Sequence, residues 1–286
     1  MSATIIDGRA ISRQIKNELV VRVERLKQYQ QNPVTIVIVK VGHNPASEVY
    51  VRNKMKACKE IGVECVLREF DKNVRTSELI LEILRLNADN DVDGILIQLP
   101  LPKHLDGTQI LSAISRRKDI DGFHPYNVGK LVIGDESFVP ATAAGVIELL
   151  TRSGVEIDGK ECVVVGRSSI VGKPVAQLLL AKNGTVTIAH SHTKNLAEVT
   201  RRADILVVAA GKRHLITAEH VKPGAVVIDV GIHRDENNKL SGDVDFESVK
   251  DVASAITPVP GGVGPMTIAM LLDGCVKHIE QKCGLR

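Results

Sequence analysis

Short, nearly continuous runs of aliphatic residues recur along this chain, and a longer segment of mixed polarity separates most runs from the next. The runs are VTIVIVKV (34–41), CVLREF (65–70), DGILIQLP (93–100), ECVVVG (161–166), ADILVVAAG (203–211) and GAVVIDVGI (224–232). Runs of this kind, bounded by turn residues, predict strands that are buried in a parallel sheet. We therefore expect parallel βαβ units with right-handed crossovers, which is an α/β fold.

The segments between the runs carry apolar residues three or four positions apart, which predicts helices. In the first segment this spacing links Ile11, Ile15, Leu19, Val23 and Leu26. The expected helices cover residues 9–30, 46–57, 78–87, 106–115, about 143–153 and 265–282. Aromatic residues make up only 2% of the chain, and such an aliphatic core suits a sheet that helices cover on both faces.

The length of 286 residues exceeds that of one average domain, so we expect two domains or one large α/β unit. The segment KDIDGFHPYNVGKLVIGDESFVPATAAG (118–145) is rich in Gly, Asp, Pro and Asn and has little periodicity. This composition is typical of a junction between domains. A second loop rich in Gly and Pro, AITPVPGGVGPM (255–266), precedes the last expected helix.

Charge and cysteine content narrow the possible classes of function. The net charge of +3 is too weakly basic to indicate nucleic-acid binding, and the scarcity of aromatic residues argues against a base-stacking surface. The five cysteines lack metal-ligand spacing, so we expect free thiols in a reducing compartment. No run reaches the ~18 apolar residues of a membrane span. We expect a cytoplasmic protein with no metal, no nucleic-acid partner and no membrane association.

The stretch VVVGRSSIVGKP (163–174) closes one aliphatic run and opens a helix. A glycine-rich turn at this place lets backbone N–H groups and the helix N-terminus contact a phosphate. The spacing Gly166-x-x-x-x-x-Gly172 departs from the common dinucleotide fingerprint, so a plain tight turn explains it equally well. The strand that follows at once completes a βαβ unit and strengthens the phosphate interpretation.

The residues after that next strand favour NADP over NAD. An NAD site usually carries an acidic residue about 20 positions after the glycine motif, where it binds the ribose 2′-hydroxyl. Here the region reads TIAHSHTKN (187–195), without an acid, while Arg167 and Ser191 supply donors that suit a phosphate. His190 and His192 lie in the same stretch, where a polar surface role is commoner than metal ligation.

Four further polar residues outside this unit are candidates for a ligand-binding site. Tyr50 and Lys54 are four residues apart, on one face of an expected helix. Gln98 ends a strand run, at the edge where open α/β sheets bind ligands, and Asp121 lies in the junction. Taken singly, each has an ordinary explanation: a solvated helix face, a glutamine that caps a loop, an aspartate in a turn. Lys56 lies about 200° from Lys54 around the helix, so we expect it to be solvated.

Taken together, the motifs resemble a known family. They are, in order, NPASEVYVRNKMKACKEIG, DGILIQLPLP, KDIDGFHPYNVGKL, VVVGRSSIVGKPVAQLLL, VKPGAVVIDVGI, GDVDF and ITPVPGGVGPMTIAMLL. The set is similar to the bifunctional methylenetetrahydrofolate dehydrogenases/methenyltetrahydrofolate cyclohydrolases and covers nearly the whole chain. The resemblance implies NADP-dependent oxidation of 5,10-methylenetetrahydrofolate, hydrolysis of the methenyl product to 10-formyltetrahydrofolate, and an active site in a cleft between two domains.

The resemblance also implies a division of the chain. Residues 1–120 with 268–286 would form the folate-binding catalytic domain, to which the last helix returns. Residues 140–267 would form a Rossmann-like NADP-binding domain, and residues 121–139 would be the junction. Family members are typically homodimers that pair through the Rossmann domain, so the same pairing is expected here.

Site residues follow from the resemblance position by position. Lys54 would be the catalytic lysine, Gln98 would support it, and Asp121 would hydrogen-bond the pterin. Tyr50 would stack on the folate ring system. The remaining positions are the NADP-binding Gly166, Arg167, Ser168, Ser191 and Ile232, and Pro260 and Gly261 in a loop that lines the cleft.

The chain departs from the family pattern near the junction, where Ala141 and Ala143 stand at positions that are commonly Cys and Pro. Loss of a proline restores backbone freedom, so we expect a looser segment there. Two other classes of protein remain open. One is a related two-domain NADP dehydrogenase of the shikimate type, which would not need Tyr50. The other is a non-catalytic NADP-binding regulator, which would have no reason to keep Tyr50, Lys54, Gln98 and Asp121 together.

Overall fold

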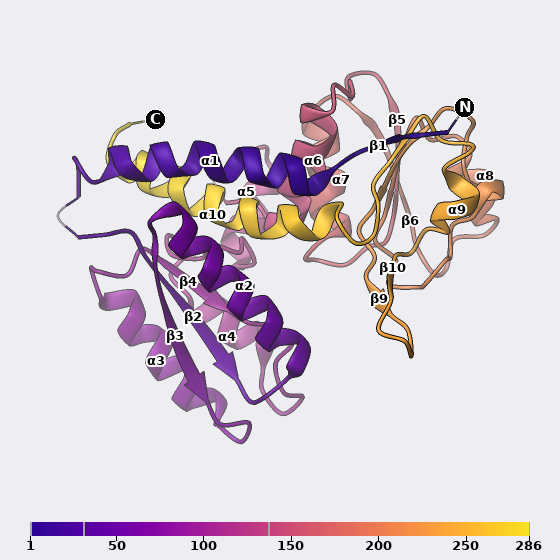
Figure 1. The fold of residues 1–286 in the computed structure, drawn as a ribbon. Coiled ribbons are helices and arrows are strands. Elements are labelled where there is room, and N and C mark those ends of the chain that lie inside the picture. The colour runs from indigo at the N-terminus through magenta and orange to yellow at the C-terminus, as the bar shows by residue number, and fades with distance from the viewer. Residues whose placement is uncertain (1, 31, 137, 286) are drawn as a thin grey trace. The chain divides into compact units, whose positions relative to one another are not determined.

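A computed structural model describes residues 2–30, 32–136 and 138–285 of the chain (Figure 1). The chain divides into two compact units. The first unit comprises Met1–Arg13 and Pro140–Met270, and the second comprises Gln14–Val139 and Leu271–Arg286. The predicted domain and junction ranges also include Met1, Gln31, Ser137 and Arg286, which lie outside the described residues.

The second unit is built on a three-stranded parallel sheet with the order β3-β2-β4. Its strands are β2 (Thr35–Val41), β3 (Glu64–Phe70) and β4 (Gly94–Ile97). β2 is central, and six of its seven residues are buried, as its β-branched sequence predicts. The parallel register puts the carboxyl ends of all three strands at one edge of the sheet.

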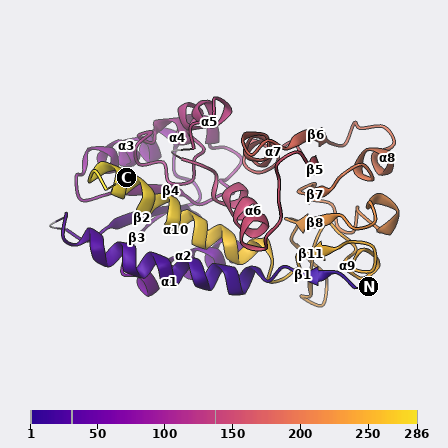
Figure 2. The same ribbon diagram turned by 90° about the horizontal axis from the view of Figure 1, so that it is seen from above.

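Helices cover both faces of this sheet. They are α2 (Pro45–Ile61), α3 (Thr76–Ala88), α4 (Gly107–Ala113) and α5 (Pro125–Val132). Figure 2 shows α3 and α4 on one side of the sheet and α2 on the other. The α3–α4 side is a continuous apolar core in which Val37 and Val39 of β2 meet Leu79 and Ile83 of α3.

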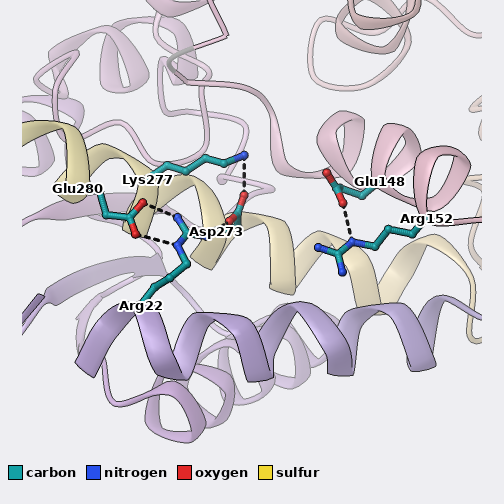
Figure 3. A network of polar contacts seen from close by, with 6 residues as sticks. All are labelled: Arg22, Glu148, Arg152, Asp273, Lys277 and Glu280. Atoms are coloured by element: carbon teal, nitrogen blue, oxygen red, sulfur yellow. Dashed lines mark hydrogen bonds and ion pairs between the residues drawn. The ribbon is translucent and has the colours of Figure 1, made fainter. Parts of the chain in front are cut away.

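Two long helices, α1 (Gly8–Leu26) and α10 (Val263–Lys282), complete the second unit with their Gln14–Leu26 and Leu271–Lys282 portions. Figure 3 shows how Arg22 of α1 joins them. Its guanidinium donates to both oxygens of Glu280, at 2.8 Å each, and to Asp273 at 2.5 Å. Asp273 also pairs with Lys277 at 2.9 Å, so each carboxylate of this network faces a cation. In the first unit, Figure 3 also shows Arg152 paired with Glu148 one turn earlier on the helix α6 (Ala141–Arg152).

The first unit is built on a six-stranded parallel sheet with the order β1-β11-β8-β7-β5-β6, and Figure 2 shows the strands in this order. The strands are β1 (Thr4–Ile5), β5 (Glu161–Val165), β6 (Thr185–Ala189), β7 (Ile205–Val208), β8 (Val226–Asp229) and β11 (Ala255–Ile256). The non-sequential order reflects crossover connections of the βαβ type. Its core is aliphatic, with Val163, Leu206 and Val227 fully buried.

Shorter elements surround this sheet. The helical ones are α6 (Ala141–Arg152), α7 (Gly172–Ala181), α8 (Leu196–Thr200), the 3₁₀ turn η1 (Ala218–His220) and α9 (Phe246–Val249). A separate antiparallel hairpin pairs β9 (His233–Arg234) with β10 (Leu240–Ser241) (Figure 1).

The α/β fold with parallel strands, a Rossmann-like unit and a returning C-terminal helix is confirmed. The helix expected over residues 9–30 is wrong at its end, because the chain turns after Leu26. The junction is more ordered than expected, since it contains α5, which Pro125 opens at a position where proline fits a helix. Ala141 and Ala143 are buried in the first turn of α6, so the expected loose segment is helical.

Candidate functional site

The side chains of Lys54 and Gln98 meet in the second unit. Lys54 lies on α2, half-buried, and its Nζ donates to Oε1 of Gln98 at 3.2 Å. Gln98 follows β4 directly, and its backbone N–H donates to the carbonyl of Val39 at 2.8 Å. Its side-chain Nε2 donates to the carbonyl of Leu99 at 2.7 Å. Because the amide nitrogen is held in this way, the amide oxygen faces the lysine.

Tyr50 lies one helical turn before Lys54 on α2, as the four-residue spacing predicts. Its side chain is 40% exposed, so part of the ring is open to a planar ligand. Lys56 lies elsewhere around the helix and its side chain is 77% exposed, which agrees with the expected solvated role. The tyrosine ring and the amine therefore share one face of α2, and Lys56 does not.

Asp121 lies in the junction and interacts electrostatically with Lys54. Burial raises the pKa of Asp121 to about 6, the positive charge of Lys54 opposes this rise, and the nearby Asp119 adds to it. Asp119 is itself buried and accepts hydrogen bonds from the backbone N–H of His124 at 2.8 Å and from Nδ2 of Asn127 at 2.8 Å. Asp119 thus orders the turn that carries Asp121, a role that the sequence did not reveal.

The glycine loop of the first unit connects β5 to α7. Gly166 has a φ of +136°, and a side chain there would clash with the carbonyl oxygen of Ala209. A side chain on Gly172 would clash with the carbonyl oxygen of Gly166. Both positions therefore require glycine, and the loop closes tightly onto the start of the ten-residue helix α7. This strand–turn–helix arrangement is the one that binds dinucleotide phosphates.

Ser168 has a partner inside the loop. Its Oγ accepts from the backbone N–H of Val171 at 3.2 Å and of Gly172 at 3.3 Å, so it holds the turn that leads into α7. A serine hydroxyl that accepts in this way keeps its own hydrogen for donation outward. Arg167 beside it is exposed, as is Ser191 after β6. These groups are donors on an accessible surface, which fits a phosphate-bearing cofactor.

The other predicted residues of the first unit also follow strands. Ile232 comes after β8 and is 47% exposed. Pro260 is exposed and follows a cis peptide bond, while Gly261 is buried with a φ of +116°. The carbonyl of Gly261 accepts from the N–H of Arg9 at 3.1 Å, and a side chain on Gly8 would clash with the carbonyl of Gly262. The start of α1 therefore holds the loop that carries Pro260 and Gly261.

Two buried carboxylates at the same edge of the six-stranded sheet were not singled out by sequence. Asp229 ends β8, and Asp243 follows the hairpin. Asp229 ends the aliphatic run VVID, whereas Asp243 follows Ser241 and Gly242 and has no such local signal. Both carboxylates accept hydrogen bonds from backbone N–H groups that lie close to the predicted cofactor residues.

Groups of three or more side chains that could ligate a metal are not found among residues 2–30, 32–136 and 138–285. The rings of His190 and His192 contact each other edge to face, with His192 exposed. All five cysteines are free thiols. In the part of the chain that the structure describes, no helix has the length and apolar character needed to span a membrane.

Comparison with known proteins gives matches over nearly the whole chain. Residues 6–121 match the family model described as the tetrahydrofolate dehydrogenase/cyclohydrolase catalytic domain. Residues 140–283 match the model described as the tetrahydrofolate dehydrogenase/cyclohydrolase NAD(P)-binding domain. The chain is 59% identical to the bifunctional protein FolD of Acetivibrio thermocellus over 286 residues, covering 100% of both chains.

Solved structures give the same result. The bifunctional FolD methylenetetrahydrofolate dehydrogenase/cyclohydrolase of Campylobacter jejuni superimposes with a TM-score of 0.96 at 46% identity, covering 98% of this chain and 100% of that one. The Trypanosoma brucei FolD enzyme, solved as a complex with NADP cofactor and an inhibitor, gives a TM-score of 0.94 at 41% identity and 99% coverage of both chains.

Proposed function

Because this chain belongs to the tetrahydrofolate dehydrogenase/cyclohydrolase family, we propose that Lys54, Gln98 and Asp121 are the catalytic residues of its reaction on a folate. The protein is a bifunctional enzyme of one-carbon metabolism, with NADP as its cofactor. It oxidises 5,10-methylenetetrahydrofolate to 5,10-methenyltetrahydrofolate and hydrolyses this product to 10-formyltetrahydrofolate.

The oxidation step asks mainly for alignment of two rings. Bound NADP+ accepts a hydride from the methylene bridge of the folate, and this leaves a cationic methenyl carbon. Gly166, Arg167 and Ser168 bind NADP at the start of α7, Arg167 and Ser191 donate to its 2′-phosphate, and Ile232 contacts the cofactor. The tight glycine loop and the exposed donors support this assignment. Because both rings are held in place, hydride transfer proceeds as a unimolecular step within one complex.

The hydrolysis step needs proton transfer. Water attacks the methenyl carbon, and the ring opens to the formyl product. Lys54 serves as the base that accepts a proton in this step. Gln98 orients this amine through the 3.2 Å contact without adding a charge beside it. The single observation that carries the proposal is therefore this contact between a half-buried lysine and an amide oxygen whose orientation is fixed from its other side.

The remaining residues bind the folate. Tyr50 stacks on the ring system with its exposed face, and Asp121 accepts hydrogen bonds from the pterin. Pro260 and Gly261 line the substrate site on a loop that the start of α1 holds through the bond from Arg9 N–H to the carbonyl of Gly261. In functional terms, residues 1–120 with 268–286 form the folate-binding catalytic domain. Residues 140–267 form the NADP-binding domain, and residues 121–139 join the two.

We also propose that the enzyme is a cytoplasmic homodimer that pairs through the Rossmann-like unit. β6 supports the pairing, because it is an outer strand of the six-stranded sheet and carries the 38% exposed Ile188. An exposed apolar side chain on an outer strand favours contact with a second chain. The five free thiols support a reducing compartment. The folate and NADP are the small-molecule partners, and no nucleic acid, membrane or metal takes part.

One assay tests the function as a whole. Purified protein is mixed with 5,10-methylenetetrahydrofolate and NADP+, and the NADPH absorbance is followed. We expect NADPH to appear, followed by loss of the methenyl absorbance as hydrolysis proceeds. An enzyme of the shikimate type would reduce NADP+ only with a different, pterin-free substrate, and a non-catalytic regulator would produce no NADPH with any substrate.

A further inference from the structure

The carboxylate of Asp243 lies fully buried between two loops at the carboxyl edge of the six-stranded sheet. Its Oδ2 accepts from the backbone N–H of Ala210 at 2.7 Å and of Gly211 at 2.8 Å, in the loop after β7. Its Oδ1 accepts from Nε2 of His233 at 2.7 Å, after β8. One side chain thus holds two loops that are separate in sequence.

The first of these loops supports the glycine loop. Ala209, next to the two anchored amides, puts its carbonyl where a side chain on Gly166 would lie. Gly166 in turn donates its N–H to the carbonyl of Ala189 at 2.8 Å. A shift of the Ala209–Gly211 segment would therefore be transmitted directly to the turn that opens α7.

The second loop carries Ile232 between two anchored neighbours. On one side, the N–H of Gly231 donates to Oδ1 of Asp229 at 2.9 Å. On the other side, His233 donates to Asp243. Asp229 also accepts from the N–H of Asp243 at 3.0 Å and of Val244 at 3.0 Å. The two carboxylates therefore form one network, and Ile232 projects from the segment that this network fixes.

The chemistry of Asp243 sets it apart from an ordinary loop aspartate. Its side-chain partner is a histidine, whose side chain is 23% exposed, and its other acceptor contacts are with backbone amides. Burial raises the pKa of the neighbouring Asp229 to about 7, and the charge of Asp243 adds to the rise. A buried charge is costly unless donors surround it, so the loops and the carboxylate stabilise one another's positions.

We propose that Asp243 is a positioning residue for NADP binding, which holds the Ala209–Gly211 and Val230–His233 segments in the shape that the cofactor requires. This inference rests on the proposed function, because it takes the carboxyl edge of this sheet as the cofactor site. Asp243 acts through the backbone and through His233, and it contacts no reacting atom.

The variants Asp243→Ala, Asp243→Asn and His233→Ala test this proposal in the full-length enzyme. We expect Asp243→Ala to raise the KM for NADP+ by about 10- to 100-fold, since it leaves two amides and an imidazole without their acceptor. Asp243→Asn keeps an oxygen for the amides, and its NH₂ group can donate to Nε2 of His233 once the imidazole proton moves to Nδ1, so we expect a smaller rise. His233→Ala removes one of three contacts and should also raise this KM.

Hydrolysis of methenyltetrahydrofolate gives the readout that separates positioning from general damage, since it consumes no cofactor. We expect its rate in all three variants to stay within about twofold of wild type. Asp204→Asn is the matched control. Asp204 also joins a backbone amide, that of Glu161, to a cation, Lys222, but it lies at the opposite edge of the same sheet. Its KM for NADP+ should be unchanged.

An unchanged KM for NADP+ in the Asp243 and His233 variants would overturn the inference, as would hydrolysis that falls in parallel with NADP binding. If Asp243→Ala does not fold, Asp243→Asn and His233→Ala still decide the question. Failure of the proposed function has a different signature, namely a wild-type enzyme that forms no NADPH from methylenetetrahydrofolate.

Discussion

Nζ of Lys54 lies 3.2 Å from Oε1 of Gln98, although the two residues are 44 positions apart in the sequence. The glutamine is fixed from behind by the bond from its Nε2 to the carbonyl of Leu99. The amine therefore has a neutral acceptor that stays in place whether the lysine carries its proton or not. A base that must lose and regain a proton in each turnover benefits from such a partner.

Replacement of Gln98 by Glu tests the need for a neutral partner. A carboxylate beside the amine would favour its protonated form, and we expect the pH–rate profile of methenyl hydrolysis to move up by about one pH unit or more. Hydrolysis at neutral pH should then fall about tenfold, because one pH unit is a factor of ten in the neutral amine. The check is to measure the rate of methenyl hydrolysis between pH 6 and pH 10, at intervals of about half a pH unit. A profile that coincides with that of wild type would argue against the role of Gln98.

Replacement of Asp121 by Ala should weaken folate binding and leave NADP binding intact, which calorimetry with each ligand measures.

The wild-type affinity for folate should also depend on pH. Since the pKa of Asp121 is raised to about 6, its carboxylate is an acceptor above that pH and is lost as the pH falls through it. The folate affinity of wild type should therefore decline below about pH 6, and that of Asp121→Ala should not. Equal weakening of both ligands would mark Asp121 as a structural turn residue.

Replacement of Arg167 by Ala tests the preference for NADP. Wild type should have a higher kcat/KM with NADP+ than with NAD+. Loss of charge-assisted hydrogen bonds to a phosphate should lower the NADP+ value about 10- to 100-fold and the NAD+ value less. Arg201→Ala, a change at another exposed arginine of the same unit, is the control and should leave the ratio unchanged. Equal efficiency of wild type with both dinucleotides would contradict the preference.

Replacement of Arg22 by Met should destabilise the second unit. The side chain of Arg22 is only 21% exposed, and its loss leaves Glu280 and Asp273 without the guanidinium. Breaking an exposed ion pair costs less than breaking a buried one, and this network is partly buried. We therefore expect the free energy of unfolding to fall by an intermediate amount, roughly 2 kcal/mol. Lys27→Met, which breaks an exposed pair with Glu24, is the control and should cost under about 0.5 kcal/mol. Denaturant titration of the two variants compares them, and equal midpoints would show that the network contributes little.

Much of this fold is predictable from the sequence because strands such as β2, β4, β5 and β7 are buried on both faces. A run such as VTIVIVKV has no polar face, and β2 is accordingly the central strand of its sheet. The two-residue strands β1 and β11 escape prediction, since two residues carry no periodicity. The helix α5 escapes as well, because Gly129 and its short length weaken its pattern within the junction.

The site divides along similar lines. The positions of Tyr50 and Lys54 on one helix face follow from local spacing, and Gln98 follows from the end of a strand. The contact of Lys54 with Gln98 depends on how α2 packs beside β4, which spacing does not reveal. Asp243 is harder still, because the three contacts of its buried carboxylate come from two loops that are separate in sequence. Local sequence patterns do not reveal contacts between segments that are far apart in the chain.

The role of Lys54 as the base of the hydrolysis step is tested most directly by a comparison of two lysine variants. Lys54 and Lys56 lie two residues apart on α2. The variant Lys56→Met is the control, because Lys56 is solvated. The measurement is the rate of loss of methenyl absorbance in each purified variant, with NADP binding as a check on folding. We expect Lys56→Met to match wild type and Lys54→Met to lose at least the ~10²- to 10⁴-fold that acid–base catalysis contributes. Near-normal hydrolysis by a folded Lys54→Met enzyme would contradict the account.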